Sequence, residues 1–408
     1  MVRSARSIAG QTFASLAYRD FRFLWAGTLL LHLGEWMEIA ALLWYAQELT
    51  GSPFLVSVLF SLRLLPMAFF SFLGGVVADR VSRRNLLIAT NLSGAAISIV
   101  LAVFVVSGIA SLWQLIVLSL LAGTVMSFYL PGRQSILPSV VPRERLMNAI
   151  SLDSGTMMAS RVGGGPLVGV LLVYGGAAAV FELRAVLALA AAVLLLFIAP
   201  YKPNEKRQTS PWQDMKDALS YLRGQPTILW LVLLNMVTML TTLSVMSLLP
   251  AFTREELHSG EWEYGLLQMG PGIGAGLSVL ALATVNSIRS KGLLLFLVLI
   301  VEGAALAGFA SVTWFWFSFS FMAVVGGMNN AFRTLDATLV QGVIPDSVRG
   351  RVMSLREVVT GLAPVATLLG GALAERLGAA AGLLAVGAVV ALAALALMFG
   401  LPQVRRLQ

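Results

Sequence analysis

Cysteine is absent from the 408 residues, and histidine occurs only twice, at His32 and His258. The absence of cysteine excludes disulfides, thiol catalysis and cysteine-ligated metals, and two histidines so far apart do not suggest a histidine-rich metal site. Charged residues amount to 12% of the chain, against about 25% in soluble domains. We expect no metal, no cofactor and no catalytic residues, and we do not expect an enzyme.

Hydrophobic residues, by contrast, make up 58% of the chain. A water-soluble chain of this length could not bury so much apolar surface, so the surrounding solvent is expected to be lipid. The net charge of +8 comes from small basic groups between long apolar runs, not from one concentrated stripe, which argues against nucleic-acid binding. The first apolar run is too long for the hydrophobic region of a cleaved signal peptide.

Twelve apolar runs are long enough to cross a bilayer core of about 30 Å as helices, which takes about 20 residues each. Strands of a membrane β-barrel would be about ten residues long and would alternate in polarity, which these runs do not. The predicted fold class is therefore an all-α integral membrane protein. The runs lie near 22–48, 54–78, 85–107, 110–132, 148–174, 177–200, 226–251, 262–285, 292–310, 312–334, 351–375 and 379–401.

The placement of Lys and Arg predicts the orientation of these runs. Basic residues concentrate in the N-terminal segment and in the connections after even-numbered runs, and Arg133 is assigned to the connection after the fourth run. The connections after odd-numbered runs are nearly free of them, so both termini should lie in the cytoplasm, as in a multi-pass protein of the cell (inner) membrane. The tryptophans at predicted outer ends, typical of an aromatic belt, are Trp113, Trp262, Trp314 and Trp316.

The two halves of the chain resemble each other. The Val-Pro pair at 141–142 and the Ile-Pro pair at 344–345 are each followed by a similar basic segment, about half the chain length apart. Six spans repeated in the same orientation are typical of a parallel-repeat transporter. We therefore predict an N-terminal six-helix bundle at 1–200 and a C-terminal six-helix bundle at 226–408.

The segment 201–225 between the predicted bundles is the one long polar interruption. Ser210 can cap a short helix that has Pro211 at its first position, and apolar residues at helical spacing follow. We interpret the segment as an amphipathic helix on the cytoplasmic membrane surface. A plain linker is the alternative.

The strongest local signal is the segment 75–84, between the second and third runs. Its glycine permits close helix approach, its acid can pair with nearby arginines or face a helix N-terminus, and its basic residues hold the loop at the cytoplasmic face. A bare positive-inside signal is the alternative, but the spacing indicates more. The residues concerned are Gly75, Asp79, Arg80, Arg83 and Arg84.

With this spacing the chain resembles the major facilitator superfamily, whose signature here is a glycine, three residues, an acid, a base, a second glycine and paired bases. Ser82 stands in place of the second glycine. Further segments resemble one bacterial efflux branch, which includes macrolide-type drug exporters, a siderophore exporter and a lysophospholipid flippase. These segments are 33–36, 49–53, 65–66 and 165–169, together with Pro131, Pro138 and Pro142 after the fourth run. The resemblance implies two six-helix bundles related by a pseudo-two-fold axis around a central cavity, with alternating access.

Two of these motifs carry implied roles. In relatives, the acid matching Asp79 meets the start of span eleven, here near 347–352, and so latches the cytoplasmic side. Gly165-Pro166-x-x-Gly169 in the fifth run resembles the core of the superfamily's antiporter motif, because proline frees a backbone carbonyl and glycine lets a neighbouring helix close in. An ordinary packing kink is the alternative. The arginine that some drug–proton antiporters carry within span four is missing from the fourth run.

Glycines recur at every second position over 270–276, inside the eighth run. No strand precedes them, so a dinucleotide site is not expected, and Gly272 and Gly276 are instead spaced for helix packing. No Walker A sequence is present, so this chain is not expected to hydrolyse ATP, whereas a separate ATPase subunit stays open.

Charged side chains within the runs carry the most functional information, because each is costly at mid-bilayer. Glu35 and Glu38 share one helical face, while Asp153 and Arg161 lie about 12 Å apart along the fifth run and should pair with other helices. Spans one, five, seven and eleven border the cavity in relatives, so these four residues are candidates for substrate binding or proton coupling. Structural ion pairing is the alternative for each. Weaker candidates are Arg63 and Asn235.

We therefore predict secondary active export of an amphipathic organic solute, driven by proton influx. Transport follows from the span count, the repeat and the motif, whereas the export direction and the proton follow from the resemblance and the buried carboxylates. We expect a monomer that contacts membrane lipids and the small-molecule substrate, and no nucleic acid. One alternative is lipid flipping or uniport without ion coupling, and the other is a non-transporting receptor or scaffold on the same fold.

Overall fold

The computed structural model describes residues 13–78, 80–201, 220, 224–284, 290–344 and 363–407, a part of the chain that contains helices and no strand. Nine helices in this part are long and apolar enough to cross a membrane. The described elements are η1 Ala14–Ala17, α2 Arg19–Thr50, α3 Pro53–Ala78, α4 Arg83–Val106, α5 Leu112–Val140, η2 Arg143–Arg145, α6 Leu146–Leu196, α8 Pro226–Glu255, α9 Glu261–Thr284, α10 Lys291–Ala310, α11 Phe315–Val343, α13 Ala363–Leu377, α14 Ala379–Gly400 and α15 Pro402–Arg405.

The observed helices confirm the all-α class, and most begin and end within a few residues of the predicted runs. The predicted fifth and sixth runs are joined in α6, where Gly176 has φ +64° and breaks the helical backbone. Glycine adopts this conformation without steric cost, so α6 contains two helices. The eleventh run is described only from residue 363 onward, and the predicted helix at 201–225 lies almost entirely outside the described residues. The count of twelve stays a prediction.

The prediction for the fourth run is wrong at its C-terminal end. Helix α5 does not end near 132 but continues through Pro131 and Pro138 to Val140. Arg133, which the charge pattern assigns to a connection between helices, therefore lies within helix α5. The polarity of this segment does not end the helix, because its side chains find partners inside the protein.

The chain divides into two compact units. Unit 1 comprises Met1–Leu42 and Pro66–Arg207, and unit 2 comprises Leu43–Leu65 and Gln208–Gln408. The end of α2 and the first half of α3 thus belong to the second unit, although they precede the midpoint of the chain.

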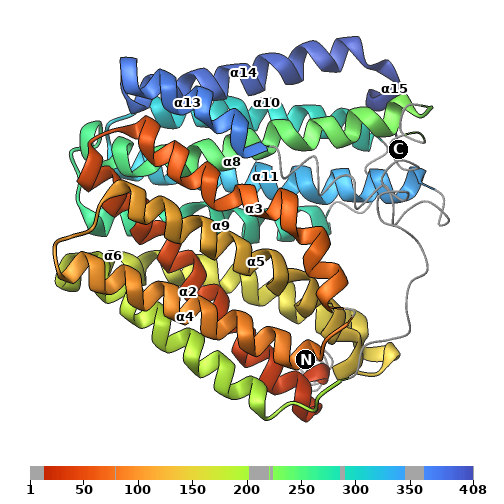
Figure 1. The fold of residues 1–408 in the computed structure, drawn as a ribbon. Coiled ribbons are helices and arrows are strands. Elements are labelled where there is room, and N and C mark those ends of the chain that lie inside the picture. The colour runs from red at the N-terminus through yellow and green to blue at the C-terminus, as the bar shows by residue number, and fades with distance from the viewer. Residues whose placement is uncertain are drawn as a thin grey trace, which may run out of the picture. The chain divides into compact units, whose positions relative to one another are not determined.

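In unit 1, α4 packs against both α5 and α6 (Figure 1). The second half of α3 approaches α5 closely at Gly74, where a β-carbon would collide with the backbone oxygen of Ser127. The close approach that the sequence assigns to Gly75 is therefore made by Gly74, since a β-carbon on Gly75 would meet nothing within 4 Å. The core of this unit contains Phe21, Leu24, Leu31, Leu87, Tyr129, Ile136, Val140, Val141, Ala149, Leu195 and Ile198.

A polar clasp joins the start of α2 to the end of α6. The Asp20 carboxylate accepts hydrogen bonds from the Tyr201 hydroxyl at 2.9 Å and from the Ala199 backbone N–H at 3.1 Å. Burial and the neighbouring carboxylate raise the pKa of Tyr201 to about 12, so its phenol remains the hydrogen-bond donor near neutral pH. These bonds place the start of α2 beside the end of the sixth predicted span.

In unit 2, α10 packs between α11 and α14 (Figure 1). Helices α9 and α11 approach closely because Gly274 lies against the backbone of Ala323 and Gly270 lies against Met322. The glycine run thus packs against a neighbouring helix, but through Gly270 and Gly274, and the prediction for Gly276 is wrong because it faces open space. The core contains Ile228, Leu231, Val232, Leu234, Leu295, Phe296, Leu299, Phe332, Leu339, Val340 and Val404.

The segment Leu43–Leu65 is held in unit 2 by hydroxyl groups. Ser52 donates to Glu375 Oε2 at 2.7 Å, and Ser61 donates to the backbone oxygen of Pro364 at 2.8 Å. Both partners lie on α13. These bonds explain why a piece of the N-terminal half clusters with the C-terminal helices.

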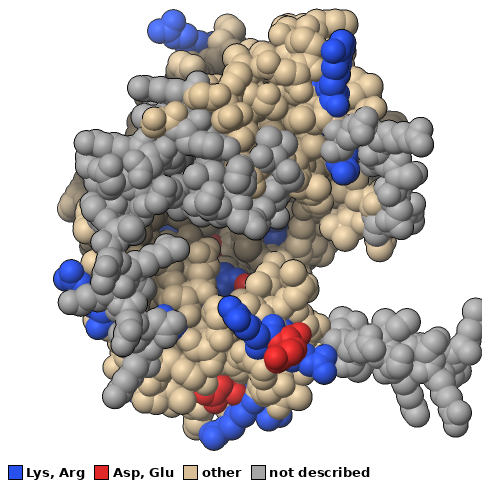
Figure 2. Space-filling view, turned by 90° about the vertical axis from the view of Figure 1, so that its right-hand side faces the viewer, with Lys and Arg blue, Asp and Glu red and all other residues tan. Residues whose placement is uncertain are grey.

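The described surface is mainly apolar. Figure 2 shows Lys and Arg side chains in a few groups on a face formed largely by uncharged residues. Many large hydrophobic side chains are exposed along α4, α6, α11 and α14. In lipid such side chains are solvated by acyl chains, so their exposure agrees with membrane-spanning helices.

Candidate functional site

Arg184, in the second helix of α6, lies between two acids of α2. Its Nη2 is 3.5 Å from Glu35 Oε2, and its Nε is 3.7 Å from Glu38 Oε2. The side chains of Arg184 and Glu38 are only 4% and 2% exposed, whereas that of Glu35 is 12% exposed. One guanidinium therefore faces two carboxylates, and Glu35 is the more accessible of the two.

Glycines on two helices make room for this arginine. A β-carbon on Gly34 of α2 would lie 2.6 Å from Arg184 Cδ, and one on Gly94 of α4 would lie 3.1 Å from Arg184 Nη2. No ordinary side chain could be placed at either position without moving the arginine. The two glycines form a slot that fixes where the guanidinium meets the acids.

Glu38 is further held by a hydroxyl group. Ser98 of α4 donates a 2.5 Å hydrogen bond to Glu38 Oε2, and its side chain is fully buried. Arg184 and Ser98 thus both contact the Glu38 carboxylate. Of these two residues, only Arg184 also contacts Glu35. The two acids therefore differ in the Ser98 bond of Glu38 and in the greater exposure of Glu35.

A second polar cluster in unit 1 joins α2, α5 and α6. Arg133 forms an ion pair with Asp153, in which Nε is 3.2 Å from Oδ1 and Nη2 contacts Oδ2. Its Nη1 lies 2.8 Å from His32 Nε2. Because arginine can only donate, His32 Nε2 must accept, so the ring proton is on Nδ1. The expectation that Asp153 pairs with another helix is confirmed.

Arg161 also reaches another helix. Its guanidinium carbon lies 4.9 Å from the centre of the Trp36 ring on α2, a cation–π contact. Asp153 and Arg161 therefore contact different partners, Arg133 and Trp36, which agrees with their predicted separation along the helix. Trp36 is a partner that the sequence does not suggest.

The two weaker candidates, Arg63 of α3 and Asn235 of α8, both lie in unit 2 and are both 3% exposed. Unit 2 also contains a fully buried acid, Glu302 of α10, which accepts a 2.9 Å hydrogen bond from Thr238 and a 3.3 Å bond from Asn329. Glu302 therefore joins α8, α10 and α11 through neutral donors.

The basic residues of the segment 75–84 are anchored rather than merely placed at a surface. Arg83 Nη1 donates to Ser139 Oγ at 2.9 Å, and Arg84 Nη1 donates to the backbone oxygen of Ile198 at 3.0 Å. Arg83 is buried and Arg80 is exposed. The two bonds tie the start of α4 to the ends of α5 and α6. Asp79 lies outside the described residues.

The span-five motif lies in the first helix of α6. Gly165 and Gly169 are buried, and the helix continues through Pro166. Next to them, Gly164 lies against Leu33 and Met37 of α2, since a β-carbon there would be 3.6 and 3.7 Å from their side chains. The glycines thus lie in a buried stretch that faces the helix carrying Glu35 and Glu38.

The described residues contain no group of three or more His, Asp or Glu side chains that could hold a metal ion. The arrangement offers instead buried carboxylates paired with arginines, which can change protonation or bind a charged solute group. Sequence reasoning misses Arg184 and Arg133 as partners, and it misses Ser98. The one local signal in the sequence for close packing of α2 beside Glu35 is the preceding residue, Gly34.

Solved structures place this fold among membrane transporters. A bacterial homologue of the human lysosomal transporter Spinster, in an inward-facing and occupied conformation, superposes with a TM-score of 0.77 over 95% of this chain and 97% of that chain. At 14% identity this likeness shows the fold alone. The described helices thus share the all-helical fold of these solved membrane proteins.

The sequence profile of the transmembrane secretion effector family matches residues 10–407. The chain therefore belongs to this family of the major facilitator superfamily, and it is a transporter and not an enzyme. It is 23% identical to the staphyloferrin A transporter of Staphylococcus aureus, covering 85% of this chain and 88% of that protein. It is also 23% identical to macrolide efflux protein A of Streptococcus pyogenes, covering 88% and 90%. The predicted family resemblance is confirmed.

Proposed function

We propose that this transporter exports an amphipathic organic solute by alternating access and that protons moving inward drive the export. The observation that carries the proton coupling is the pair Glu35 and Glu38 facing the single guanidinium of Arg184. Relatives whose names specify macrolide efflux and staphyloferrin A transport support a solute that is larger and more amphipathic than a simple ion.

Glu35 is the proposed proton carrier. Two carboxylates that face one guanidinium repel each other, so ionising one hinders ionising the other. When Glu35 takes up a proton, Arg184 can pair fully with Glu38. When Glu35 releases the proton, the arginine is shared again, and the α2–α6 contact changes with it. Since Glu35 is the more exposed acid and lacks the Ser98 bond, exchange with water is easier there than at Glu38.

Asp153 and Arg161 are proposed as further substrate or coupling residues of unit 1, and Arg63 and Asn235 as weaker candidates of unit 2. Asp153 is bound to Arg133 and Arg161 to Trp36, so both are positioned by α5 and α2. A solute with an anionic or aromatic group could exchange for one of these contacts. The protein is proposed to act as a monomer of twelve spans in two six-helix bundles, at 1–200 and 226–408, in the inner membrane with both termini cytoplasmic.

The segment 75–84 is proposed as the conformational switch. Arg83 and Arg84 fix the start of α4 to α5 and α6. The proposed role of the Asp79 carboxylate is to latch the cytoplasmic side when the transporter opens outward. Asp79→Asn should cut transport and shift cysteine accessibility toward the inward-open state while the protein still inserts. Unchanged transport and accessibility would reduce the segment to a topology signal.

The test of the export proposal is uptake into inverted membrane vesicles, screened over a macrolide, a siderophore and a lysolipid, with and without a pH gradient. We expect accumulation of at least one compound that collapses when a protonophore removes the gradient. Equilibration without accumulation would favour uncoupled uniport, and movement of the lysolipid alone would favour lipid flipping. Binding without any movement would favour a receptor.

A further inference from the structure

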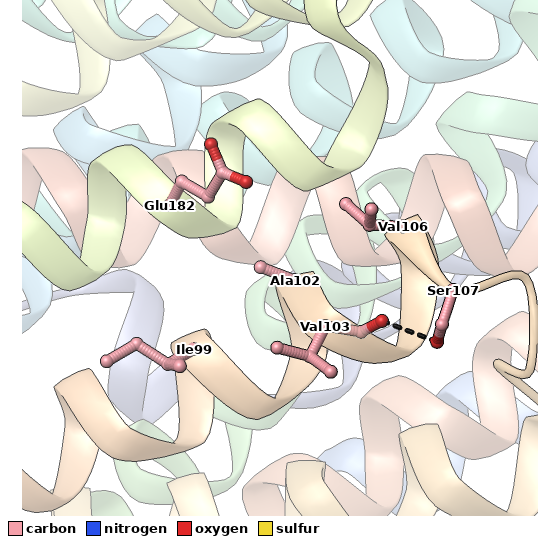
Figure 3. A pocket seen from close by; sticks show the side chains of 6 residues that line it. All are labelled: Ile99, Ala102, Val103, Val106, Ser107 and Glu182. Carbon is pink, nitrogen blue, oxygen red and sulfur yellow. Dashed lines mark hydrogen bonds between the residues drawn. The ribbon is translucent and has the colours of Figure 1, made fainter.

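A groove opens on the surface of unit 1 between the C-terminal part of α4 and the second helix of α6 (Figure 3). Its volume is about 350 Å³. Ile99, Val103 and Val106 lie along one side and are 47%, 55% and 71% exposed. Ala102, Ser107 and Glu182 complete the lining. The groove is therefore apolar apart from one carboxylate and the Ser107 hydroxyl, and it lies on a surface that lipid would solvate.

Glu182 is exposed, and no described basic side chain forms an ion pair with it. Arg184, two positions further along the helix, points into the protein and pairs with Glu35 and Glu38. A carboxylate that faces lipid is costly unless a cation or a proton balances it. The groove thus provides acyl-chain contacts and lacks a positive group from the described chain.

The depth of the groove matches the boundary between lipid headgroups and acyl chains. Helix α4 ends at Val106, and the second helix of α6 begins after Gly176, so Glu182 lies about 9 Å along that helix. Helical side chains lean toward the N-terminus of their helix, which brings the carboxylate back toward this end. Trp113, at the start of α5 after the same turn, is 65% exposed, as an interfacial tryptophan would be.

Ser107 adds a second acceptor. Its hydroxyl donates a 2.6 Å hydrogen bond to the backbone oxygen of Val103, so its oxygen is left with lone pairs that point away from its own proton. Glu182 and Ser107 lie apart in the groove, and each offers acceptors without a free side-chain donor (Figure 3). Such a site suits a primary ammonium, which has three N–H donors, better than a trimethylammonium, which has none.

We propose that this groove binds a phospholipid with a primary-amine headgroup, such as phosphatidylethanolamine. The ammonium pairs with Glu182, and one acyl chain lies along Ile99, Val103 and Val106. An anionic lipid headgroup would be repelled by the same carboxylate. This proposal is independent of the substrate and of proton coupling, because it concerns the outer surface of α4 and α6 and none of the residues in the candidate site.

The test uses lipids with identical acyl chains and headgroups that differ only in methylation: phosphatidylethanolamine, its N-monomethyl form and phosphatidylcholine. Each is added to the purified full chain in detergent, and retained lipid is counted by native mass spectrometry. Retention should fall as N–H donors are lost, by roughly tenfold from the first lipid to the last. Glu182→Gln should remove the preference while the protein stays folded, because the position is exposed. The matched control, Glu144→Gln, changes an exposed acid outside the groove and should preserve it.

Filling the groove gives a second test. Val103→Trp should lower retention of all three lipids, because the tryptophan side chain fills the apolar part of the groove and leaves the carboxylate in place. Equal retention of the ethanolamine and choline lipids by the unaltered chain would overturn the proposal, as would an unchanged preference in Glu182→Gln. Displacement of the lipid by a quaternary-ammonium dye, with tighter binding of the dye than of phosphatidylethanolamine, would instead assign the groove to a cationic solute.

Discussion

Arg184 Nη2 lies 3.5 Å from Glu35 Oε2, so a residue of the sixth predicted span pairs with an acid of the first, 149 positions earlier in the chain. The pairing is possible because Gly34 and Gly94 leave a slot for the arginine between α2 and α4. The same guanidinium also faces Glu38. A change of charge at Glu35 therefore alters the ion pair that links α2 to α6.

Removing the arginine should destabilise the protein. Arg184→Ala leaves Glu35 and Glu38 buried without this cation, which by comparison with other broken buried pairs should cost about 3–5 kcal/mol of unfolding free energy. Thermal unfolding in detergent, followed by size-exclusion chromatography, measures the loss. Arg254→Ala is the control, because the Arg254–Glu48 pair is 39% and 50% exposed and should contribute little. Equal losses in the two variants would show that Arg184 is not a buried anchor.

Alanine substitution is expected to change stability in opposite directions at two glycines of unit 1, Gly34 and Gly163. Gly34→Ala should destabilise by about 1–3 kcal/mol, because its β-carbon would overlap Arg184 Cδ inside a packed region. Gly163→Ala is the matched control, since a β-carbon there meets nothing within 4 Å and alanine favours the helix. Melting temperatures of both variants provide the comparison. A neutral Gly34→Ala would mean that the arginine can move aside.

The Arg133–Asp153 pair should show energetic coupling. Arg133→Gln and Asp153→Asn should each destabilise unit 1, and the double variant should recover part of the loss, with a coupling energy of about 1 kcal/mol or more. A double-mutant cycle of unfolding free energies measures it. The exposed Arg254–Glu48 pair should give a coupling near zero in the same assay. Additive losses at Arg133 and Asp153 would show that the contact contributes nothing.

The sequence predicts most of the helices because each is a long apolar run with polar or glycine-containing ends. It also predicts that Glu35 and Glu38 share a face, since residues three apart always do on a helix. It cannot predict Arg184 as their partner, because that contact depends on how α2 and α6 pack. Arg133 is misplaced for a related reason: a charge near the end of a run is expected in a loop unless a partner on another helix, here Asp153, is known.

The orientation can be tested without altering native cysteines, because the chain has none. Gln208→Cys should react with a membrane-impermeant maleimide only from the cytoplasmic side, and His258→Cys, at an exposed position, only from outside. Labelling in intact cells and in inverted vesicles separates the two. Reaction of both cysteines from the same side would contradict twelve spans with both termini in the cytoplasm.

The most direct test of proton-driven export is simultaneous measurement of substrate uptake and internal pH in proteoliposomes with an imposed pH gradient, using a compound identified in the vesicle screen. The unaltered protein should concentrate the substrate while protons move the opposite way. Glu35→Gln should bind the substrate and exchange it downhill but should neither concentrate it nor move protons, whereas Glu144→Gln should behave as the unaltered protein. Normal accumulation by Glu35→Gln, with the pH change intact, would contradict the assignment of Glu35 as the proton carrier.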